Sequence, residues 1–269
     1  MDHTTFIITG ASQGMGASMA AIAAQKGVQV VLVARDQAAL EKEAQQIVQN
    51  GGSARVVAGD ISQHEVCRKA VSQAMESFGR IDAVINNAAI IGPILPVADL
   101  PLEEWMHTLE VNLLGPVMLC REAIPYLRQT CGRVVNVSSG VAFVSIPAGS
   151  AYCVSKAALN HFSRVLSAEE PSITVVAINP GGMDTQMMAD VREKGQGVKP
   201  FEEFHRYFVD RYEQGQLLSP DVSALATVTL ALAAPHEMTG EYIDFQDEKG
   251  QKMVQECAAI LAHKNADPI

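Results

Sequence analysis

The sequence predicts an α/β fold in which a doubly wound parallel sheet lies between two layers of helices, a three-layer α/β/α sandwich in a single domain. Short apolar runs alternate with longer amphipathic stretches along the chain, which is the pattern of repeated strand and helix pairs. Most apolar runs are rich in Val and Ile without strict alternation, as expected of strands covered on both faces. Helices between such strands return the chain to the same edge of the sheet.

The elements follow in order from these patterns. Residues 5–9 predict a first strand and 16–26 the helix after it, and residues 28–34 and 37–49 predict the next pair. Further strands are predicted at residues 54–58, 83–85, 133–137, 174–178 and 241–245. The order is Rossmann-like, and in such sheets ligands bind at the carboxyl ends of the strands.

The expected domain covers residues 1–250, followed by a C-terminal tail at residues 251–269. Within the domain, the segment 186–218 is long, polar and rich in glycine and charge. We interpret it as a flap over the site, giving a substrate loop at about residues 183–218; the alternative is a set of ordinary surface helices and loops.

The composition excludes several classes of function. The 269 residues carry 20 Lys and Arg against 30 Asp and Glu, a formal charge of −10, so we expect no nucleic-acid partner, since phosphate binding needs clustered cations. No secretory signal is visible, and no apolar run reaches the ~20 residues that span a bilayer, so no membrane partner is expected either. Five widely spaced cysteines without a CxxC pair predict no metal site and a reduced, cytoplasmic protein.

A glycine-rich turn follows the first predicted strand and opens the first helix. Glycines there would let the backbone turn tightly and approach a pyrophosphate, while N–H groups at the helix start face the anion. Glycines also mark ordinary loops. The candidate cofactor-binding residues of this turn are Gly10, Ser12, Gln13, Gly14, Met15 and Gly16.

The spacing G-x-x-x-G-x-G of this turn resembles that of the short-chain dehydrogenases/reductases, and the resemblance runs from residue 5 to about residue 248. It implies a nicotinamide cofactor. Asp60 and Ile61 match the family segment in which the Asp meets the adenine amine. Asn87, Ala88 and Ala89 match a second segment, although the family usually has Gly where this chain has Ala89. Either the backbone there has a negative φ, or the methyl group crowds the ribose.

The end of the second strand bears on the choice of cofactor. NAD-preferring relatives have an acidic residue for the ribose hydroxyls where this chain has Ala34. The next residue, Arg35, has a guanidinium suited to a 2′-phosphate, and Ser12 could add a hydrogen bond, so NADP(H) is expected. The alternative is a solvated arginine at a strand end, with Asp36 beside it.

A second group of residues carries the chemistry. Tyr152 and Lys156 are four apart and lie on one face of a predicted helix, and Ser139 precedes Tyr152 at the spacing of the family. Reduction of a ketone needs a proton, and a phenol with a pKa near ~10 needs a cation such as Lys156 to stabilise its phenolate. The resemblance implies that Ser139 polarises the substrate carbonyl and that Asn112 anchors a water linking Lys156 to solvent.

Residues 179–185, with the sequence NPGGMDT, resemble the family segment that lines the nicotinamide. Pro180 and Gly181 would contact the cofactor, and Thr185 would bond the carboxamide and so fix one nicotinamide face toward the substrate. Met183 could form an adaptable apolar wall for an aromatic diketone, together with two further methionines at 187 and 188, although methionines more often fill a core.

Segments 155–162, 167–171 and 239–245 resemble the branch that contains sepiapterin reductases and benzil reductases. In sepiapterin reductases an Asp at the position of Asp244 anchors the pterin, so Asp244 is either a substrate ligand or a strand-end cap of a turn. The expected function is NADPH-dependent reduction of a ketone or diketone, with Ser139, Tyr152, Met183 and Asp244 at the substrate.

Two other functions compete with this one. An NAD-dependent alcohol or hydroxysteroid dehydrogenase of the same fold is disfavoured by Arg35, and a non-catalytic nucleotide-binding regulatory protein is disfavoured by the intact catalytic group. The resemblance also implies a homodimer or homotetramer, paired through the two long helices that begin near Leu102 and Ala151.

Overall fold

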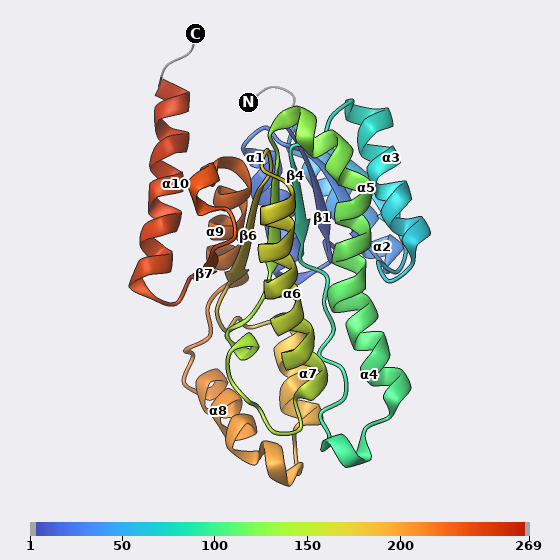
Figure 1. Cartoon of the computed structure of the whole chain (residues 1–269), viewed down its shortest axis with the longest axis vertical. Helices are drawn as coiled ribbons and strands as arrows, with labels where there is room; N and C mark the ends of the chain where they lie inside the picture. The colour runs from blue at the N-terminus through green and yellow to red at the C-terminus, as the bar shows by residue number, and fades with distance from the viewer. Residues whose placement is uncertain (1–3, 267–269) are drawn as a thin grey trace.

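Seven parallel strands form one sheet, in the order β3-β2-β1-β4-β5-β6-β7. The computed structural model describes residues 4–266, with side chains for residues 4–262, and the sheet occupies the centre of the molecule in Figure 1. Every predicted strand is present, with ends displaced by one residue at most. The strands are β1 (Thr5–Thr9), β2 (Gln29–Ala34), β3 (Ser53–Ala58), β4 (Ala83–Asn86), β5 (Arg133–Val137), β6 (Thr174–Asn179) and β7 (Tyr242–Asp244).

Helices cover both faces of the sheet and its carboxyl edge. The helices used below are α1 (Gly14–Gln25), α2 (Gln37–Gln49), α3 (His64–Phe78), α4 (Leu102–Leu109), α5 (Gly115–Thr130), α6 (Ser150–Glu169), α7 (Gln186–Lys194), α8 (Glu202–Glu213), α9 (Pro220–Ala233) and α10 (Glu248–Ala266). Short turns of 3-10 helix include η1 (Val97–Asp99), η3 (Gly140–Ala142), η4 (Lys199–Phe201) and η5 (His236–Met238), and η2 (Glu110–Leu114) is a π-helical turn between α4 and α5.

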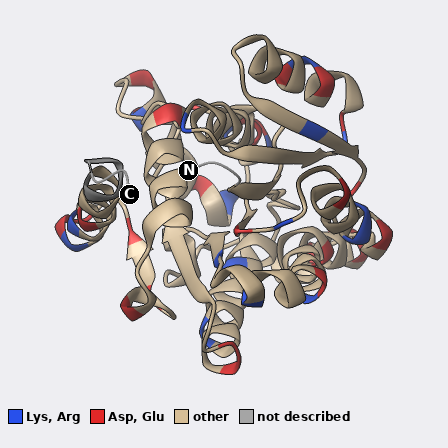
Figure 2. Ribbon diagram, turned by 90° about the horizontal axis from the view of Figure 1, so that it is seen from above, with Lys and Arg blue, Asp and Glu red and all other residues tan. Residues whose placement is uncertain are grey.

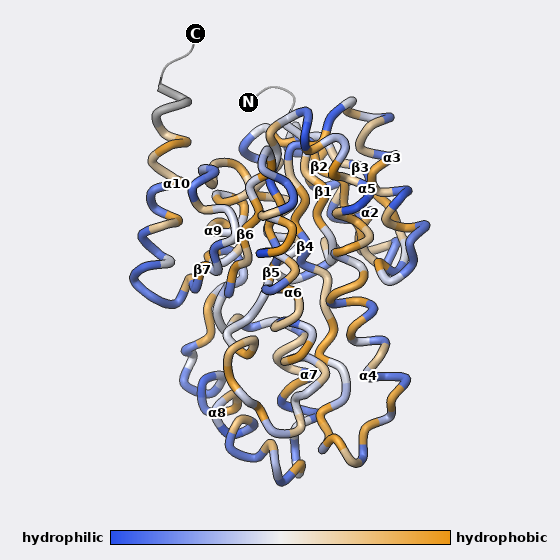
Figure 3. Tube along the Cα trace, viewed as in Figure 1, coloured by the Kyte–Doolittle hydropathy of each residue, from blue (hydrophilic) through white to orange (hydrophobic). Residues whose placement is uncertain are grey.

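Two apolar cores lie on opposite faces of the sheet because successive strand residues point to opposite sides. Phe6 and Ile8 of β1 pack with α1, α2, α9 and α10, whereas Ile7 packs with α3, α5 and α6. All three side chains are fully buried, and burial of each contributes about 1.5–3 kcal/mol relative to exposure. Figure 3 shows the resulting apolar colour along the central strands.

The C-terminal segment has more structure than the sequence reading gave it. Residues 251–266, expected as a tail, belong to α10, and its Val254 and Cys257 are buried in the core beneath α9. These apolar residues are spaced as in a helix, but the sequence reading assigned no element to the segment after the last strand. The final three residues of the expected tail lie outside the described residues.

The substrate segment at about residues 183–218 consists mainly of α7, η4 and α8. These helices lie beyond the carboxyl ends of the strands, at the lower end of the molecule in Figure 1. The segment is therefore helical, and residues of α7 and α8 line the large pocket; its action as a flap stays a prediction.

The topology determines where a ligand binds. β1 pairs with both β2 and β4, so the order of the strands reverses between β1 and β4 and the connections diverge there, which opens a crevice at the carboxyl edge. Figure 2 shows that charged residues concentrate on the outer helices and loops. Within the described part of the chain, no helix is both long and apolar enough to cross a membrane.

Candidate active site

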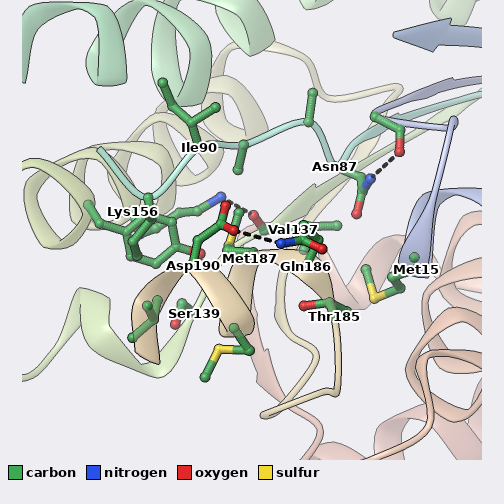
Figure 4. A pocket seen from close by; sticks show the side chains of 18 of the residues that line it. Met15, Asn87, Ile90, Val137, Ser139, Lys156, Thr185, Gln186, Met187 and Asp190 are labelled. Carbon is green, nitrogen blue, oxygen red and sulfur yellow. Dashed lines mark hydrogen bonds between the residues drawn. The ribbon is translucent and has the colours of Figure 1, made fainter. Parts of the chain in front are cut away.

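A large pocket opens at the carboxyl edge of the sheet (Figure 4). Its volume of about 1480 Å³ exceeds the ~300–1,000 Å³ of most small-molecule sites, which leaves room for a dinucleotide and a second small molecule. Loops after β1 to β6 line it, together with α7 and α8. Every residue assigned above to the cofactor or the substrate lines this pocket, whereas Asn112 does not.

The glycine-rich turn has the shape that a phosphate group requires. Gly10 and Gly14 have φ values of 67° and 54°, which side chains rarely adopt, and a Cβ at Gly16 would overlap the carbonyl oxygen of Gly10. Gln13 caps α1 without a side-chain hydrogen bond, so the first N–H groups of the helix remain available. These residues fit a pyrophosphate at the start of α1.

Hydrogen bonds join the ends of β1 and β4 at this point. Asn87 Nδ2 donates to the carbonyl of Thr9 at 2.8 Å, and the Thr9 hydroxyl accepts from the N–H groups of Asn87 and Ala88 at 2.9 and 3.0 Å. Ala89 is not among the residues with positive φ. Of the two alternatives given for the Ala that replaces the family Gly, the negative φ is therefore correct, and the backbone accommodates alanine without strain.

Arg35 and Asp60 line the part of the pocket where the adenosine of the cofactor is expected to bind. Asp60 accepts from the N–H and the hydroxyl of Ser62 at 2.9 and 2.7 Å. Burial raises the pKa of Asp60, but these bonds and the charge of Arg35 outweigh it and lower the pKa overall. Asp36 accepts from the N–H of Ala39 at 3.0 Å and caps α2, so its carboxylate is engaged by that helix.

The proposed proton donor, lysine and serine lie at the other end of the same pocket. Ser139 follows β5, and Tyr152 and Lys156 lie on α6. Lys156 Nζ donates to the carbonyl of Val137 at 2.7 Å and lies 5.5 Å from the centre of the Tyr152 ring. Figure 4 shows the lysine nitrogen directed at that carbonyl. Ser139 Oγ accepts from the N–H of Val141 at 3.4 Å.

The pKa directions of this pair differ from the expectation that Lys156 lowers the pKa of Tyr152. Burial raises the Tyr152 pKa, and the neighbouring Cys153 adds to the effect. Burial also lowers the pKa of Lys156 to about 7. Desolvation is therefore the main cause of both shifts in the protein alone. The consequence is a phenol that stays protonated over the physiological range, which is the state a proton donor needs.

Asn112 is held inside the protein beside α6. It lies in the π-helical turn η2, accepts from the N–H of Ile90 at 2.8 Å, and donates to the Ile90 carbonyl at 2.9 Å and to Ser155 Oγ at 3.0 Å. Both amide protons are thus used. A water near Lys156 can therefore bond to Asn112 only by donating to one of the oxygens of Asn112.

The segment after β6 completes the pocket. Gly181 has a φ of 89°, and Thr185 begins α7 without a side-chain capping bond. Asp244 Oδ1 accepts from Asn179 Nδ2 at 3.0 Å and from the N–H of Gln246 at 2.9 Å, so the turn cap is observed, although Asp244 also lines the pocket. Met183 is half-buried and pairs with Leu218 in an isolated bridge.

Sequence reasoning missed most of the apolar wall over the site. A small cluster separate from the two main cores contains Ile94, Val191 and Phe201, with Phe204 and Phe208 packed against it, and all five line the pocket. The signal was present, because aromatic residues recur at helical spacing in an otherwise polar segment.

Comparisons with known proteins agree with this arrangement. The profile of the short chain dehydrogenase family matches residues 4–196. An uncharacterised oxidoreductase of Schizosaccharomyces pombe is 36% identical over 89% of this chain and 95% of its own length. A benzil reductase of Saccharomyces cerevisiae that forms (S)-benzoin is 31% identical over 90% of this chain and 96% of its own.

Among solved structures, the KRED1-Pglu enzyme superposes with a TM-score of 0.84 at 36% identity, covering 89% of this chain and all of that one. Sequence and fold therefore agree over almost the whole length of these relatives. The protein belongs to the short-chain dehydrogenase/reductase family of oxidoreductases.

Proposed function

We propose that the protein is an NADPH-dependent carbonyl reductase that acts on an apolar ketone or diketone. The observation that carries the proposal is that Ser139, Tyr152 and Lys156 line the same pocket as the glycine-rich turn and Arg35. A nucleotide end and a proton-donating end in one cavity are what the transfer of a hydride and a proton requires.

The nucleotide end supports NADP(H). Arg35 brings a cation to the end of β2, and Asp36, the acidic residue that follows it in the sequence, is engaged as the cap of α2. A guanidinium binds a phosphate with charge-assisted hydrogen bonds. In the bound state, NADPH supplies the hydride that is added to the carbonyl carbon.

The remaining chemistry belongs to side chains of this chain. Ser139 orients the substrate carbonyl by a hydrogen bond to its oxygen, and the Tyr152 phenol gives its proton to the alkoxide that develops there. The Lys156 ammonium then stabilises the phenolate that remains, because opposite charges favour each other strongly in a buried site. The pKa of Lys156, about 7 in the protein alone, is expected to rise as the phenolate forms.

The apolar wall supports a hydrophobic substrate. Side chains of Val141, Ile146, Met187, Met188 and Phe204 line the same pocket as Ser139, Tyr152 and Lys156, and methionine and aromatic groups adapt to planar apolar molecules. The relative from Saccharomyces cerevisiae named as a benzil reductase is similar over nearly the full chain, which favours aromatic diketones as first substrates to assay.

The test is NADPH oxidation with diketones, quinones, pterins and simple aldehydes, repeated with NADH. We expect turnover with NADPH and an aromatic diketone, weaker turnover with NADH, and loss of activity in Tyr152→Phe. Preference for NADH would refute the cofactor assignment. A folded protein that binds NADPH but turns over no carbonyl would instead favour a regulatory nucleotide-binding role.

A further inference from the structure

Two residues other than glycine have a left-handed backbone within residues 4–266. They are Cys131, with a φ of 46°, and Ala148, with a φ of 62°. Side chains rarely adopt this conformation because the Cβ atom crowds the neighbouring carbonyl oxygen, whereas glycine adopts it without that cost. Such strain persists only where the surrounding structure maintains it, and it is concentrated at functional sites.

The left-handed conformation of Ala148 belongs to a tight turn. The Gly149 N–H donates to the Ile146 carbonyl at 3.1 Å, with Pro147 and Ala148 between them. A proline at the second position and a positive φ at the third are the features of a type II turn, whose third residue is usually glycine or asparagine. Alanine therefore occupies a position where the turn itself favours glycine.

The two strained side chains lie in different surroundings. Cys131 ends α5, and its side chain is exposed. Ala148 is only 9% exposed and belongs to the small apolar cluster that contains Ile94, Val191 and Phe201. Burial of the alanine methyl group offsets the strain at Ala148, whereas no burial offsets it at Cys131.

The cluster around Ala148 joins the substrate segment to two loops at the carboxyl edge of the sheet. Val191 of α7 and Phe201 of η4 belong to the substrate segment, and Ile94 belongs to the loop after β4. The Ala148 carbonyl also accepts from the N–H of Leu95 in that loop, at 3.0 Å. Ala148 does not line the large pocket. It can therefore affect a substrate only through the residues that it packs against.

These neighbours form part of the apolar wall over the site. Phe204 and Phe208 pack against the cluster and line the large pocket. We propose that Ala148 is a positioning residue for the proposed reaction, because its methyl group fastens the substrate segment to the turn before α6. The inference rests on the proposed function for the nature of the substrate. Without the methyl group the wall is held less firmly, so an apolar ketone binds more weakly, while the hydrogen bonds of the turn persist.

The experiment compares Ala148→Gly with Cys131→Gly, two changes that relieve the same kind of strain. Only the first removes a methyl group from the cluster. Amide hydrogen exchange in α7 and α8 should become about fourfold faster in Ala148→Gly, the equivalent of one buried methyl group, and should stay unchanged in Cys131→Gly. The melting temperature should rise by about 2–4 °C in Cys131→Gly, where nothing offsets the relief of strain, and should change less in Ala148→Gly.

Steady-state kinetics separates a role in holding the wall from a role in the chemical step. With benzil and saturating NADPH, Ala148→Gly should raise KM about fourfold and leave kcat within about twofold of the parent value, because uniform binding is lost. Ala148→Ser keeps the Cβ atom and should keep the parent KM. The affinity for NADPH should be the same in all these variants.

Unchanged hydrogen exchange of α7 and α8 in Ala148→Gly would overturn the proposal, whether or not the protein reduces carbonyls. A fall in kcat with an unchanged KM would also overturn it, because Ala148 would then act on Tyr152 and not on the wall. A parent protein that binds NADPH but reduces no carbonyl refutes the proposed function instead, and hydrogen exchange then decides whether Ala148 fastens the substrate segment.

Discussion

Replacing Lys156 with Met should stabilise the protein at neutral and acidic pH. Lys156 is 2% exposed, and burial lowers its pKa from 10.5 to about 7, a difference of about 3.5. One whole pKa step corresponds to ~1.4 kcal/mol, so keeping the ammonium charged in the folded protein costs at most ~5 kcal/mol below pH 7. Loss of the hydrogen bond to Val137 offsets ~1–3 kcal/mol of that gain. The free energy of unfolding should therefore rise by ~2–4 kcal/mol.

The stability difference between Lys156→Met and the parent protein should depend on pH in a definite direction. Between pH 7 and pH 10.5 the unfolded chain keeps the Lys156 proton and the folded protein releases it, so the parent protein gains stability as pH rises through this range. The advantage of Lys156→Met should shrink over the same range. Urea denaturation near pH 6 and near pH 9, with the exposed Lys42→Met as control, measures both effects. A variant less stable than the parent near pH 6, or a difference that is the same at both pH values, would refute this reasoning.

Three further predictions concern the cofactor, the proton and the assembly. Arg35→Ala should weaken NADPH by ~10- to 100-fold, the worth of charged hydrogen bonds to a phosphate, and NADH by less than about threefold; fluorescence titration measures both, and equal losses would contradict the assignment. Tyr152→Phe should lower turnover by ~10²- to 10⁴-fold with NADPH binding intact, and near-normal turnover of the variant would mean that another group supplies the proton. Reductive activity of the parent should fall as pH rises above about 7, because the Lys156 ammonium that stabilises the phenolate loses its proton there, while burial keeps Tyr152 protonated. We also propose that the protein is a homodimer or homotetramer, since Leu102, Met106 and Val154 are exposed on α4 and α6; light scattering should give at least twice the 28.8 kDa of one chain, and a single-chain mass would contradict it.

The residues predicted to bind the nucleotide line one pocket, and the sequence could bring them together because their signals are local. The glycines of the first turn need positive φ or close packing, and those needs are met where the spacing placed them. Arg35 and Asp60 follow the ends of β2 and β3 within two residues, and Thr185 lies in the loop after β6. Strand ends are readable from apolar runs, so the meeting of these residues at one edge of the sheet followed from the fold.

What the sequence did not predict depends on burial and contacts between distant segments. The pKa directions of Tyr152 and Lys156 follow from desolvation, which spacing along a helix does not reveal. The side chain of Asn112 bonds to the backbone of Ile90, a partner set by the packing of η2 that the sequence does not reveal, and its expected link through a water to Lys156 stays a prediction. The aromatic wall of α8 was missed because its segment is polar overall and its apolar neighbours come from other loops.

The small apolar cluster around Ile94, Val191 and Phe201 packs apart from the two cores that hold the sheet. The stability of this cluster therefore depends little on the two main cores. Amide hydrogens of α7 and α8 are expected to exchange with solvent sooner than those of the central strands. Such separation also has an evolutionary meaning. Substitutions at Phe204 or Phe208, which line the large pocket, are expected to change the shape of the pocket while the sheet keeps its two cores, so the lining can vary among relatives without loss of the fold.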